Sequence, residues 1–174
     1  IMDRRNLGFH SGMASDFLVD LMNSGVVTNI TKPFDRGVST TAILLGKTKL
    51  YEFAHNNKKL KLRPSWHTHS GDVHLLKNFV SINSALEVDL TGQVGAEELN
   101  GVPVSAIGGQ PDLVRAAHRS DGGHAIIALP SSAKDGKFSR IVSKLSGPVT
   151  TARSDVDVIV TENGAVDLRG KDLG

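Results

Sequence analysis

The stretch that decides the fold reads Ser105-Ala-Ile-Gly-Gly-Gln-Pro-Asp-Leu-Val-Arg-Ala-Ala-His-Arg-Ser120, followed by Asp121-Gly-Gly-His-Ala-Ile-Ile-Ala-Leu-Pro130. Its pattern predicts a strand over 102–107, a glycine turn, a helix, a second glycine turn and a second buried strand. Pro111 is typical of a first helical turn, where its missing N–H leaves no bond unmade, and Asp112 suits the positive end of the helix dipole. The apolar face of this helix is Leu113, Val114, Ala116 and Ala117.

Two glycine pairs bracket the expected helix. Gly108-Gly109 lets the backbone turn through conformations that a side chain forbids, and Gly122-Gly123 ends the helix. A glycine turn that opens a helix presents free N–H groups, which suit a phosphate, a carboxylate or the oxyanion of an acyl-transfer intermediate. The alternative is a tight strand-to-helix connection that binds nothing, and the motif alone is weak enough to favour this plainer interpretation.

The composition narrows the classes of partner. With 174 residues, 39% of them hydrophobic, the chain fits one domain with a real core. Aromatic residues make up only 5% and the Lys and Arg residues are scattered, so we expect no nucleic-acid partner. No stretch reaches the ~18 apolar residues of a membrane span, and the first six residues are not typical of a signal peptide. We therefore expect no membrane partner.

The cysteine count and the first residue add two expectations. The chain has no cysteine, which excludes disulfides, thiolate catalysis and cysteine zinc sites and fits a reducing compartment. A cytoplasmic location is the corresponding prediction. Because the chain begins on Ile1 rather than Met, we expect it to be part of something longer.

Other segments have clear helical or strand patterns. Ser15 is expected to cap a helix whose apolar positions are Phe17, Leu18, Leu21 and Met22 and which ends near Gly25. Leu50–Ala54 is expected to be a second, short helix. The remaining predicted strands are Thr40–Leu45, Leu60–Pro64, Phe138–Leu145, Val149–Ala152 and Val156–Thr161.

Phe79–Leu90 alternates strongly and predicts two successive strands around a polar kink. Glu87 and Asp89 lie two apart on one face of the second strand, as an acid/base pair would. The alternative, which the pattern favours, is a solvated polar face on an antiparallel strand. Glu162, before Asn163-Gly164, is a further catalytic candidate, although a carboxylate beside a turn is more often simply exposed.

The segment Trp66-His-Thr-His-Ser-Gly-Asp-Val-His74 holds the chain's densest group of metal-ligand types. On a strand, His67 and His69 would face the same side, with Asp72 and His74 available to complete a shell. Nothing else in the chain has ligand spacing, and surface histidines are common, so the prediction is that no metal is bound.

Several motifs in order resemble the C-terminal half of the acetyl-CoA hydrolase/transferase family, which includes 4-hydroxybutyrate and succinate:acetate CoA-transferases. The resemblance covers nearly the whole chain. The motifs are Leu7-Gly-Phe-His-Ser-Gly-Met13 with Ser15-Asp16, Gly25-Val-Val-Thr-Asn29, Ser81-Ile-Asn-Ser-Ala-Leu-Glu-Val-Asp-Leu-Thr-Gly-Gln-Val94, Ile107-Gly-Gly-Gln110 with Asp112, Gly122-Gly123 before Ala125-Ile-Ile-Ala-Leu-Pro130, Ser139-Arg-Ile141, and Val160-Thr-Glu-Asn-Gly-Ala-Val-Asp-Leu-Arg-Gly170.

The resemblance implies a fold and partners. The fold is an open α/β sandwich of the CoA-transferase type, with a mixed, mostly parallel sheet flanked by helices. Residues 1–174 would form the C-terminal domain, without the N-terminal half of the parent chain. The substrates would be an acyl-CoA and a carboxylate acceptor, with coenzyme A bound and no metal required. By analogy with relatives, we expect a homodimer.

The resemblance also implies a chemistry. These transferases attack the acyl-CoA thioester with a glutamate and carry CoA as a glutamyl thioester, while glycine-turn N–H groups stabilise the oxyanion. The catalytic candidates are Gly108, Gly109 and Glu87. The candidates for binding CoA are Asn83, Gln110, Asp112, Gly122 and Gly123.

One departure from the family pattern bears directly on this chemistry. The family glutamate falls two residues after His10, where this chain has Gly12, so no enzyme-bound thioester can form at this position. Three explanations stay open. Another carboxylate replaces it, with Glu87 or Glu162 as candidates; water or the acceptor attacks the thioester directly; or the protein binds acyl-CoA without catalysis.

Overall fold

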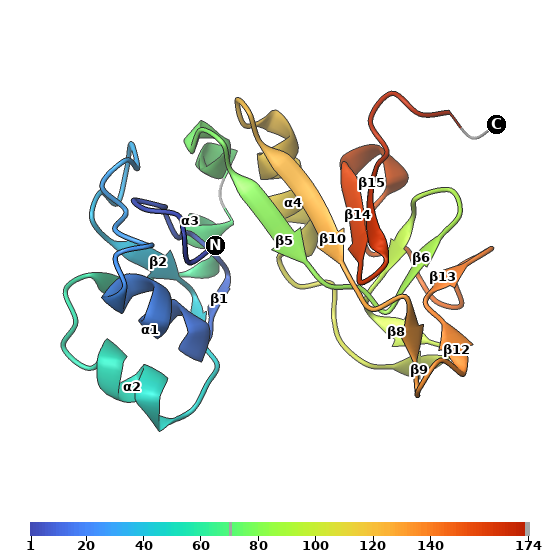
Figure 1. Ribbon diagram of the computed structural model, residues 1–174, viewed down its shortest axis with the longest axis horizontal. Coiled ribbons are helices and arrows are strands. Elements are labelled where there is room, and N and C mark those ends of the chain that lie inside the picture. The colour runs from blue at the N-terminus through green and yellow to red at the C-terminus, as the bar shows by residue number, and fades with distance from the viewer. Residues whose placement is uncertain (70, 173–174) are drawn as a thin grey trace. The chain divides into compact units, whose positions relative to one another are not determined.

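The computed structural model describes residues 1–69 and 71–172 (Figure 1). The chain divides into two compact units, Ile1–Leu76 and Lys77–Gly174. Each unit has its own buried apolar cluster, so each has an interior of its own. The sequence has no linker at this boundary, and the division follows from packing. The assignment of residues 1–174 to one C-terminal domain stays a prediction.

The first unit is built from short helices and two pairs of parallel strands. β1 pairs with β3, and β2 pairs with β4. The elements are β1 (Met13–Ala14), α1 (Asp16–Asn23), β2 (Ser39–Thr41), β3 (Ile43–Leu44), α2 (Thr48–Ala54), β4 (Leu60–Leu62), α3 (Ser65–Thr68) and the 3-10 helix η1 (Gly71–Leu75).

Both helices predicted for this unit are confirmed. α1 follows Ser15, although the Ser15 side chain makes no capping hydrogen bond, and α2 contains the expected short helix. The face of α1 was predicted only in part: Leu18 and Leu21 are buried, but Phe17 is 56% exposed. Val19, which was not predicted for this face, is buried.

The single strand predicted over Thr40–Leu45 is wrong. The N–H groups of Ala42 and Ile43 both donate to the carbonyl oxygen of Gly12, at 3.1 and 3.0 Å. This shared acceptor breaks the regular alternation of a strand, and the segment divides into β2 and β3. β2 is buried, whereas Ile43 and Leu45 are exposed.

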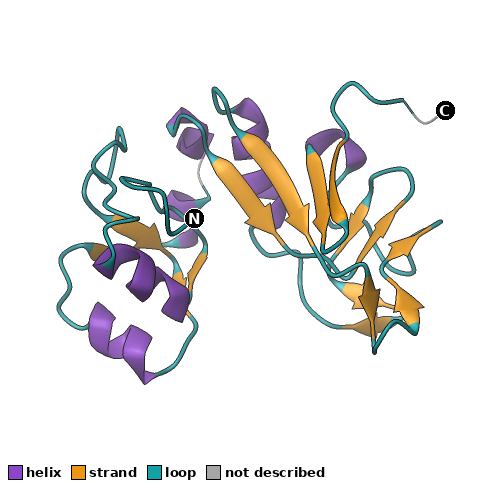
Figure 2. Ribbon diagram, in the orientation of Figure 1, coloured by secondary structure: helices purple, strands orange, loops and turns teal. Residues whose placement is uncertain are grey.

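The second unit is organised around a four-stranded sheet in the order β15-β14-β10-β5 (Figures 1 and 2). β5, β10 and β14 are parallel, and β15 returns antiparallel beside β14. The elements are β5 (Val80–Asn83), β6 (Glu87–Asp89), β7 (Val94–Gly95), β8 (Glu98–Leu99), β9 (Val102–Pro103), α4 (Gln110–Arg119), β10 (His124–Ala128), β11 (Ser132–Ala133), β12 (Phe138–Ser139), β13 (Ile141–Val142), η2 (Arg153–Asp155), β14 (Val158–Thr161) and β15 (Gly164–Asp167).

The helix and buried strand predicted from the central stretch are confirmed as α4 and β10. Val114 and Ala117 of α4 are fully buried against Ala125 and Ile127 of β10. The strand predicted over 102–107 is wrong beyond Pro103. The N–H groups of Val104 and Ser105 both donate to the Glu97 carbonyl oxygen, and this shared acceptor ends the regular pairing of β9 with β8.

Smaller pairings complete this unit. Phe79–Leu90 forms β5 and β6, as predicted, and Glu162–Asn163 is the turn between β14 and β15. Phe138–Leu145 forms two short strands instead of one. The strand predicted over Val149–Ala152 is wrong, because only Thr151 pairs, through a single bridge to Val94.

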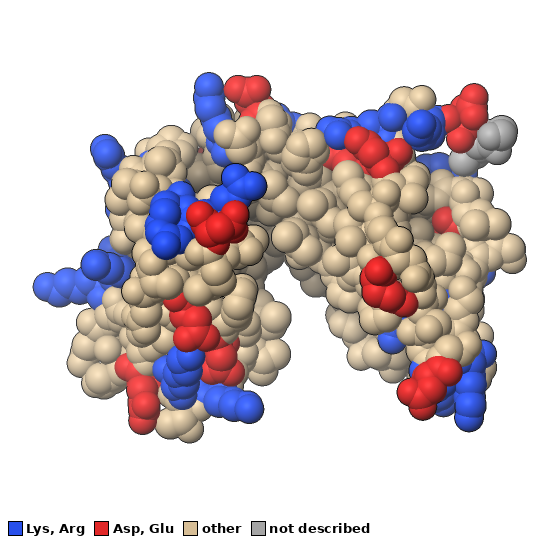
Figure 3. Space-filling model, in the orientation of Figure 1, with Lys and Arg blue, Asp and Glu red and all other residues tan. Residues whose placement is uncertain are grey.

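The fold class is confirmed as mixed α/β, with a mostly parallel main sheet. On the face drawn in Figure 3, basic and acidic side chains are interspersed, as the scattered charges of the sequence indicated. Within the described residues, no helix combines the length and the apolar character needed to cross a membrane.

Candidate functional site

The carboxyl ends of the three parallel strands meet at one edge of the main sheet. Asn83 ends β5 and pairs with Ile127 of β10, while Thr161 ends β14. α4 precedes β10 and packs along both β10 and β5. Its first turn therefore lies toward this edge, and the helix runs from there to the start of β10. Ligands of open α/β sheets bind outside the carboxyl ends of the strands. The second unit therefore has a structural reason for a site at this edge.

The Gly108-Gly109 turn opens α4 at this edge. Gly108 has a φ of +57°, in the left-handed region that favours glycine, and Gly109 is the N-cap residue. Gln110 is tied down by a 3.1 Å hydrogen bond from its Nε2 to Thr151 Oγ1, while Asp112 is exposed in the first turn. The first N–H groups of a helix have no partner within it, so they face an approaching anion.

Gly122 and Gly123 lie at the other end of α4. A Cβ on Gly123 would stand 2.1 Å from the Ala117 carbonyl oxygen, and one on Gly122 would stand 2.3 Å from Asn78 Oδ1. These glycines let the end of α4 pack closely against the start of β5 and β10. A helix of this length places them about 15 Å from Gly108-Gly109, so the two glycine pairs do not share one site.

Glu87 and Asp89 are buried, with 9% and 4% exposure, so the interpretation as a solvated face is wrong. Glu87 Oε2 accepts hydrogen bonds from the N–H and the Oγ of Ser146, both at 2.9 Å. Asp89 accepts bonds from Thr91 and Gln93; burial raises its pKa, but these bonds outweigh it and hold the pKa below its usual value. Both carboxylates are therefore engaged, Glu87 by the distant Ser146 and Asp89 by the turn that follows it.

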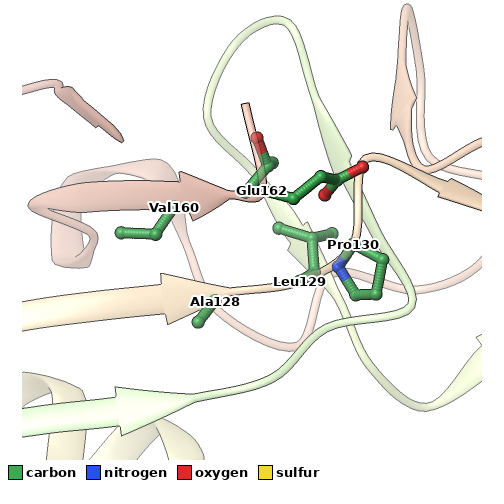
Figure 4. A pocket seen from close by; sticks show the side chains of 6 residues that line it. Ala128, Leu129, Pro130, Val160 and Glu162 are labelled. Atoms are coloured by element: carbon green, nitrogen blue, oxygen red, sulfur yellow. The ribbon is translucent and has the colours of Figure 1, made fainter. Parts of the chain in front are cut away.

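A hollow of about 430 Å³ is lined by the ends of β10 and β14 (Figure 4). The lining residues are Ala128, Leu129, Pro130, Val160, Thr161 and Glu162. The Glu162 carboxylate accepts hydrogen bonds from Ser131, at 2.8 Å from its N–H and 2.5 Å from its Oγ. These bonds hold the pKa of Glu162 below its usual value, so the exposed carboxylate is ionised at neutral pH.

The first unit contains a cluster of ionisable side chains that the sequence analysis did not predict. Asp35 accepts hydrogen bonds from His67 Nε2 at 2.8 Å and from Thr40 Oγ1 at 3.0 Å. Lys32 lies beside it and donates from Nζ to the carbonyl oxygens of Phe9 and Val38, at 3.1 and 2.9 Å. The ring of His10 lies 6.0 Å from that of His67.

Burial sets the charge states in this cluster. Burial lowers the pKa of Lys32 to about 8, although the negative charge of Asp35 acts to raise it. Burial, followed by the charge of Lys32, lowers the pKa of His10 to about 4. Burial raises the pKa of Asp35, but hydrogen bonds from His67 and Thr40 hold it below its usual value. At neutral pH the cluster thus holds an ionised Asp35 and an uncharged His10.

Gly12 lies beside His69. A Cβ on Gly12 would stand 2.6 Å from His69 Nε2 and 2.9 Å from its Cε1. The imidazole of His69 therefore takes the space that a side chain at position 12 would need. The two residues are 57 positions apart, and only the fold brings them together.

The histidines do not form the predicted ligand strand. Pro64 has a φ of −62°, close to the helical value, and leads into α3, which contains His67 and ends before His69. His67 Nε2 bonds Asp35, and His69 Nδ1 lies 3.1 Å from the Ser65 carbonyl oxygen. Across residues 1–69 and 71–172, no three His, Cys, Asp or Glu side chains are grouped as a metal site.

Comparison with known proteins agrees with this architecture. The fold and the edge of the main sheet define an α/β protein of the CoA-transferase type. Residues 46–174 match the family model described as the acetyl-CoA hydrolase/transferase C-terminal domain. The chain belongs to this family, as its motifs predicted.

Individual relatives include both sequences and solved structures. The chain is 42% identical over 182 residues to the 4-hydroxybutyrate coenzyme A transferase of Clostridium kluyveri, covering 99% of this chain and 41% of that protein. RipA from Yersinia pestis has a TM-score of 0.92 at 43% identity, covering 98% of this chain and 39% of that one. A 4-hydroxybutyrate CoA-transferase structure from Porphyromonas gingivalis has a TM-score of 0.83 at 35% identity, covering 97% and 39%. The chain thus spans about two fifths of the length of these relatives.

Proposed function

We propose that the protein acts on acyl-CoA thioesters, either transferring CoA to a carboxylate acceptor or hydrolysing the thioester. The observation that carries this proposal is family membership, supported by relatives named as CoA-transferases and as an acetyl-CoA hydrolase. The glycine turn at the edge of the main sheet adds physical support, because its N–H groups suit an oxyanion or a phosphate.

The proposed roles follow the geometry of the second unit. The N–H groups at Gly108 and Gly109 stabilise the thioester oxyanion, and Gln110 holds this turn through Thr151. Asn83 ends β5 at the same edge and is proposed to contact CoA, as is the exposed Asp112. Glu87 positions the chain around Ser146, and its direct part in catalysis stays a prediction. The binding role predicted for Gly122 and Gly123 also stays a prediction, with their close packing as the competing reason for glycine.

Gly12 favours a second candidate function. If the family glutamate belongs at this position, the chain lacks the nucleophile that carries CoA. The alternative is an acyl-CoA-binding relative without turnover. For either function we propose a cytoplasmic location, from the absence of cysteine, and a homodimer, by analogy with the family.

The test uses the full-length protein with a panel of short acyl-CoA thioesters. Free thiol is followed with and without acetate as acceptor. Thiol release without acceptor indicates hydrolysis, and a new acyl-CoA formed only with acceptor indicates transfer. Neither signal, with CoA still bound in calorimetry, indicates the binding relative.

A substitution at the turn sharpens this test. Gly109→Val removes the room for a substrate at the first helical turn, so we expect turnover to fall by about 10²-fold or more, as for loss of an oxyanion donor. The melting temperature should stay close to that of the wild type. Retained activity in Gly109→Val would remove Gly109 from the site.

A further inference from the structure

The contact between Gly12 and His69 is fixed from both sides. The Gly12 carbonyl oxygen accepts the N–H groups of Ala42 and Ile43, which ties residue 12 to β3. The N–H of His69 donates to the Ser65 carbonyl oxygen at 2.8 Å, which ties residue 69 to α3. Backbone hydrogen bonds therefore hold both residues, and the contact of Nδ1 with the Ser65 carbonyl oxygen orients the ring.

The tautomer of His69 is assigned from its hydrogen-bond partners. Nδ1 lies 3.1 Å from the Ser65 carbonyl oxygen, which can only accept, so Nδ1 carries the hydrogen. Thr68 Oγ1, at 3.0 Å from the same nitrogen, has the Ser65 oxygen as its own acceptor at 3.4 Å. Nε2 is then the nitrogen with the free lone pair, and it is the atom that faces Gly12.

The neighbouring histidines are arranged differently. His67 Nε2 is engaged by the Asp35 carboxylate, and His10 is 7% exposed with its Nε2 on the Thr68 carbonyl oxygen at 3.1 Å. His69 is partly exposed, and within the described residues no hydrogen bond to its Nε2 is recorded. The ionisable groups of the same unit's cluster are His10, His67, Lys32 and Asp35.

We propose that His69 is a general base that activates water for hydrolysis of an acyl-CoA thioester beside Gly12. An imidazole whose Nδ1 is held by a hydrogen bond, and whose Nε2 lies against a glycine and bonds no other described residue, can accept a proton from water. This inference rests on the proposed function and deepens it. It selects hydrolysis over CoA transfer and names the residue that replaces the missing carboxylate at position 12.

The step balances with water as the only co-reactant. His69 Nε2 takes a proton from water while the water oxygen forms a bond to the thioester carbonyl carbon. The tetrahedral intermediate then collapses, the carbon–sulfur bond breaks, and the sulfur leaves with the electron pair. The sulfur takes the proton from Nε2, which returns neutral His69, a carboxylic acid and the thiol of CoA. The acid then ionises to solvent.

The experiment measures thiol release from acyl-CoA by the full-length protein carrying His69→Gln or His69→Ala. Glutamine keeps polar contacts but takes no proton, so we expect kcat to fall between about 10²- and 10⁴-fold with little change in KM. The acidic limb of the kcat profile that a general base produces should disappear in His69→Gln. Added imidazole should restore part of the activity of His69→Ala.

The matched control is His55→Gln, an exposed histidine that follows α2 in the same unit, and it should stay within about twofold of the wild type. A rate of thiol release in His69→Gln within threefold of the wild-type rate would overturn the inference and leave the proposed function standing. Lost activity that imidazole does not restore, with an unchanged acidic limb in His69→Gln, would give His69 a structural role only. A wild type without thiol release or transfer would overturn the proposed function, and this inference with it.

Discussion

The two units bury ionisable side chains of opposite kinds. The first unit buries bases, His10 and Lys32, and burial lowers the pKa of both. The second unit buries acids, Glu87, Asp89 and Asp157, and each accepts hydrogen bonds from nearby N–H or O–H groups. Asp157, for example, accepts the Ala125 N–H at 2.9 Å.

The difference shows two ways in which the chain accommodates buried ionisable groups. Burial penalises the charged form of any group, and hydrogen bonds to the charged form offset this penalty. Two of the three buried side-chain atoms without a partner in the described residues, His10 Nδ1 and Arg63 Nε, lie in the first unit. Unsatisfied and desolvated groups cluster at functional sites more often than in frameworks.

The largest expected effect comes from restoring a carboxylate in the first unit. Gly12→Glu alone should gain little, because the new Cβ would stand 2.6 Å from His69 Nε2. Gly12→Glu combined with His69→Ala removes this clash, and we expect CoA transfer to acetate to rise by about 10²-fold or more over the wild type. Acyl exchange between acetate and a labelled acyl-CoA measures it. Equal transfer rates in the single and double variants would show that His69 does not obstruct a carboxylate at position 12.

In the second unit, Asp89→Ala tests the framework. It removes the acceptor of four hydrogen bonds from Thr91 and Gln93, so we expect the free energy of unfolding to fall by about 3 kcal/mol. Urea unfolding of the full-length protein measures the change. Asp121→Ala, at an exposed carboxylate, is the matched control and should stay within about 0.5 kcal/mol. Similar losses in both variants would contradict the framework role.

His10 gives the first unit a pH dependence of its own. Folded His10 stays neutral down to about pH 4, whereas the unfolded chain binds this proton near pH 6.5. The unfolded state therefore holds more protons between these values, and stability falls by about 3 kcal/mol as the pH drops from 6.5 to 4. Urea unfolding at several pH values should show this loss, and His10→Gln should reduce it. An unchanged slope in His10→Gln would show that other groups cause the loss.

Lys32 gives the stability of the protein a second pH dependence, at alkaline pH. Folded Lys32 loses its proton near pH 8 and the unfolded chain near 10.5, so the unfolded state again holds more protons between these values. Stability should rise by about 2 kcal/mol from pH 8 to pH 9.5, and Lys32→Met should lack this rise. Thermal melts at matched ionic strength compare the two proteins. A rise that persists in Lys32→Met would place the titrating group elsewhere.

The smallest effect is expected for Glu87→Gln. An amide can still accept the N–H of Ser146, so a positioning role predicts a change in kcat within about threefold. Steady-state thiol release measures it, with Glu162→Gln as the comparison at an exposed carboxylate. A loss of about 10²-fold for Glu87→Gln would instead assign catalysis to this buried carboxylate.

The sequence predicted the helices of both units and the main parallel strands better than it predicted the short strands. α4 and β10 carry dense local signals: Pro111 in the first turn, glycines at both ends, and an apolar face that packs on Ala125 and Ile127. The six-residue strand before them was wrong because regular pairing needs a partner for each residue, and the pairing with β8 ends where Val104 and Ser105 share the Glu97 carbonyl oxygen. The buried state of Glu87 and Asp89 was missed because alternation does not say which face of a strand meets solvent.

Local pattern in the sequence was enough to establish the family, the mixed α/β class, and the positions of α1, α2, α4 and the main parallel strands. Tertiary structure alone brought His69 to Gly12 and gathered His10, Lys32, Asp35 and His67. The physical reason is the sequence separation between the residues that interact. Helices, turns and alternating strands follow from contacts a few residues apart, whereas burial, tautomer and pKa depend on groups that only the folded chain places together.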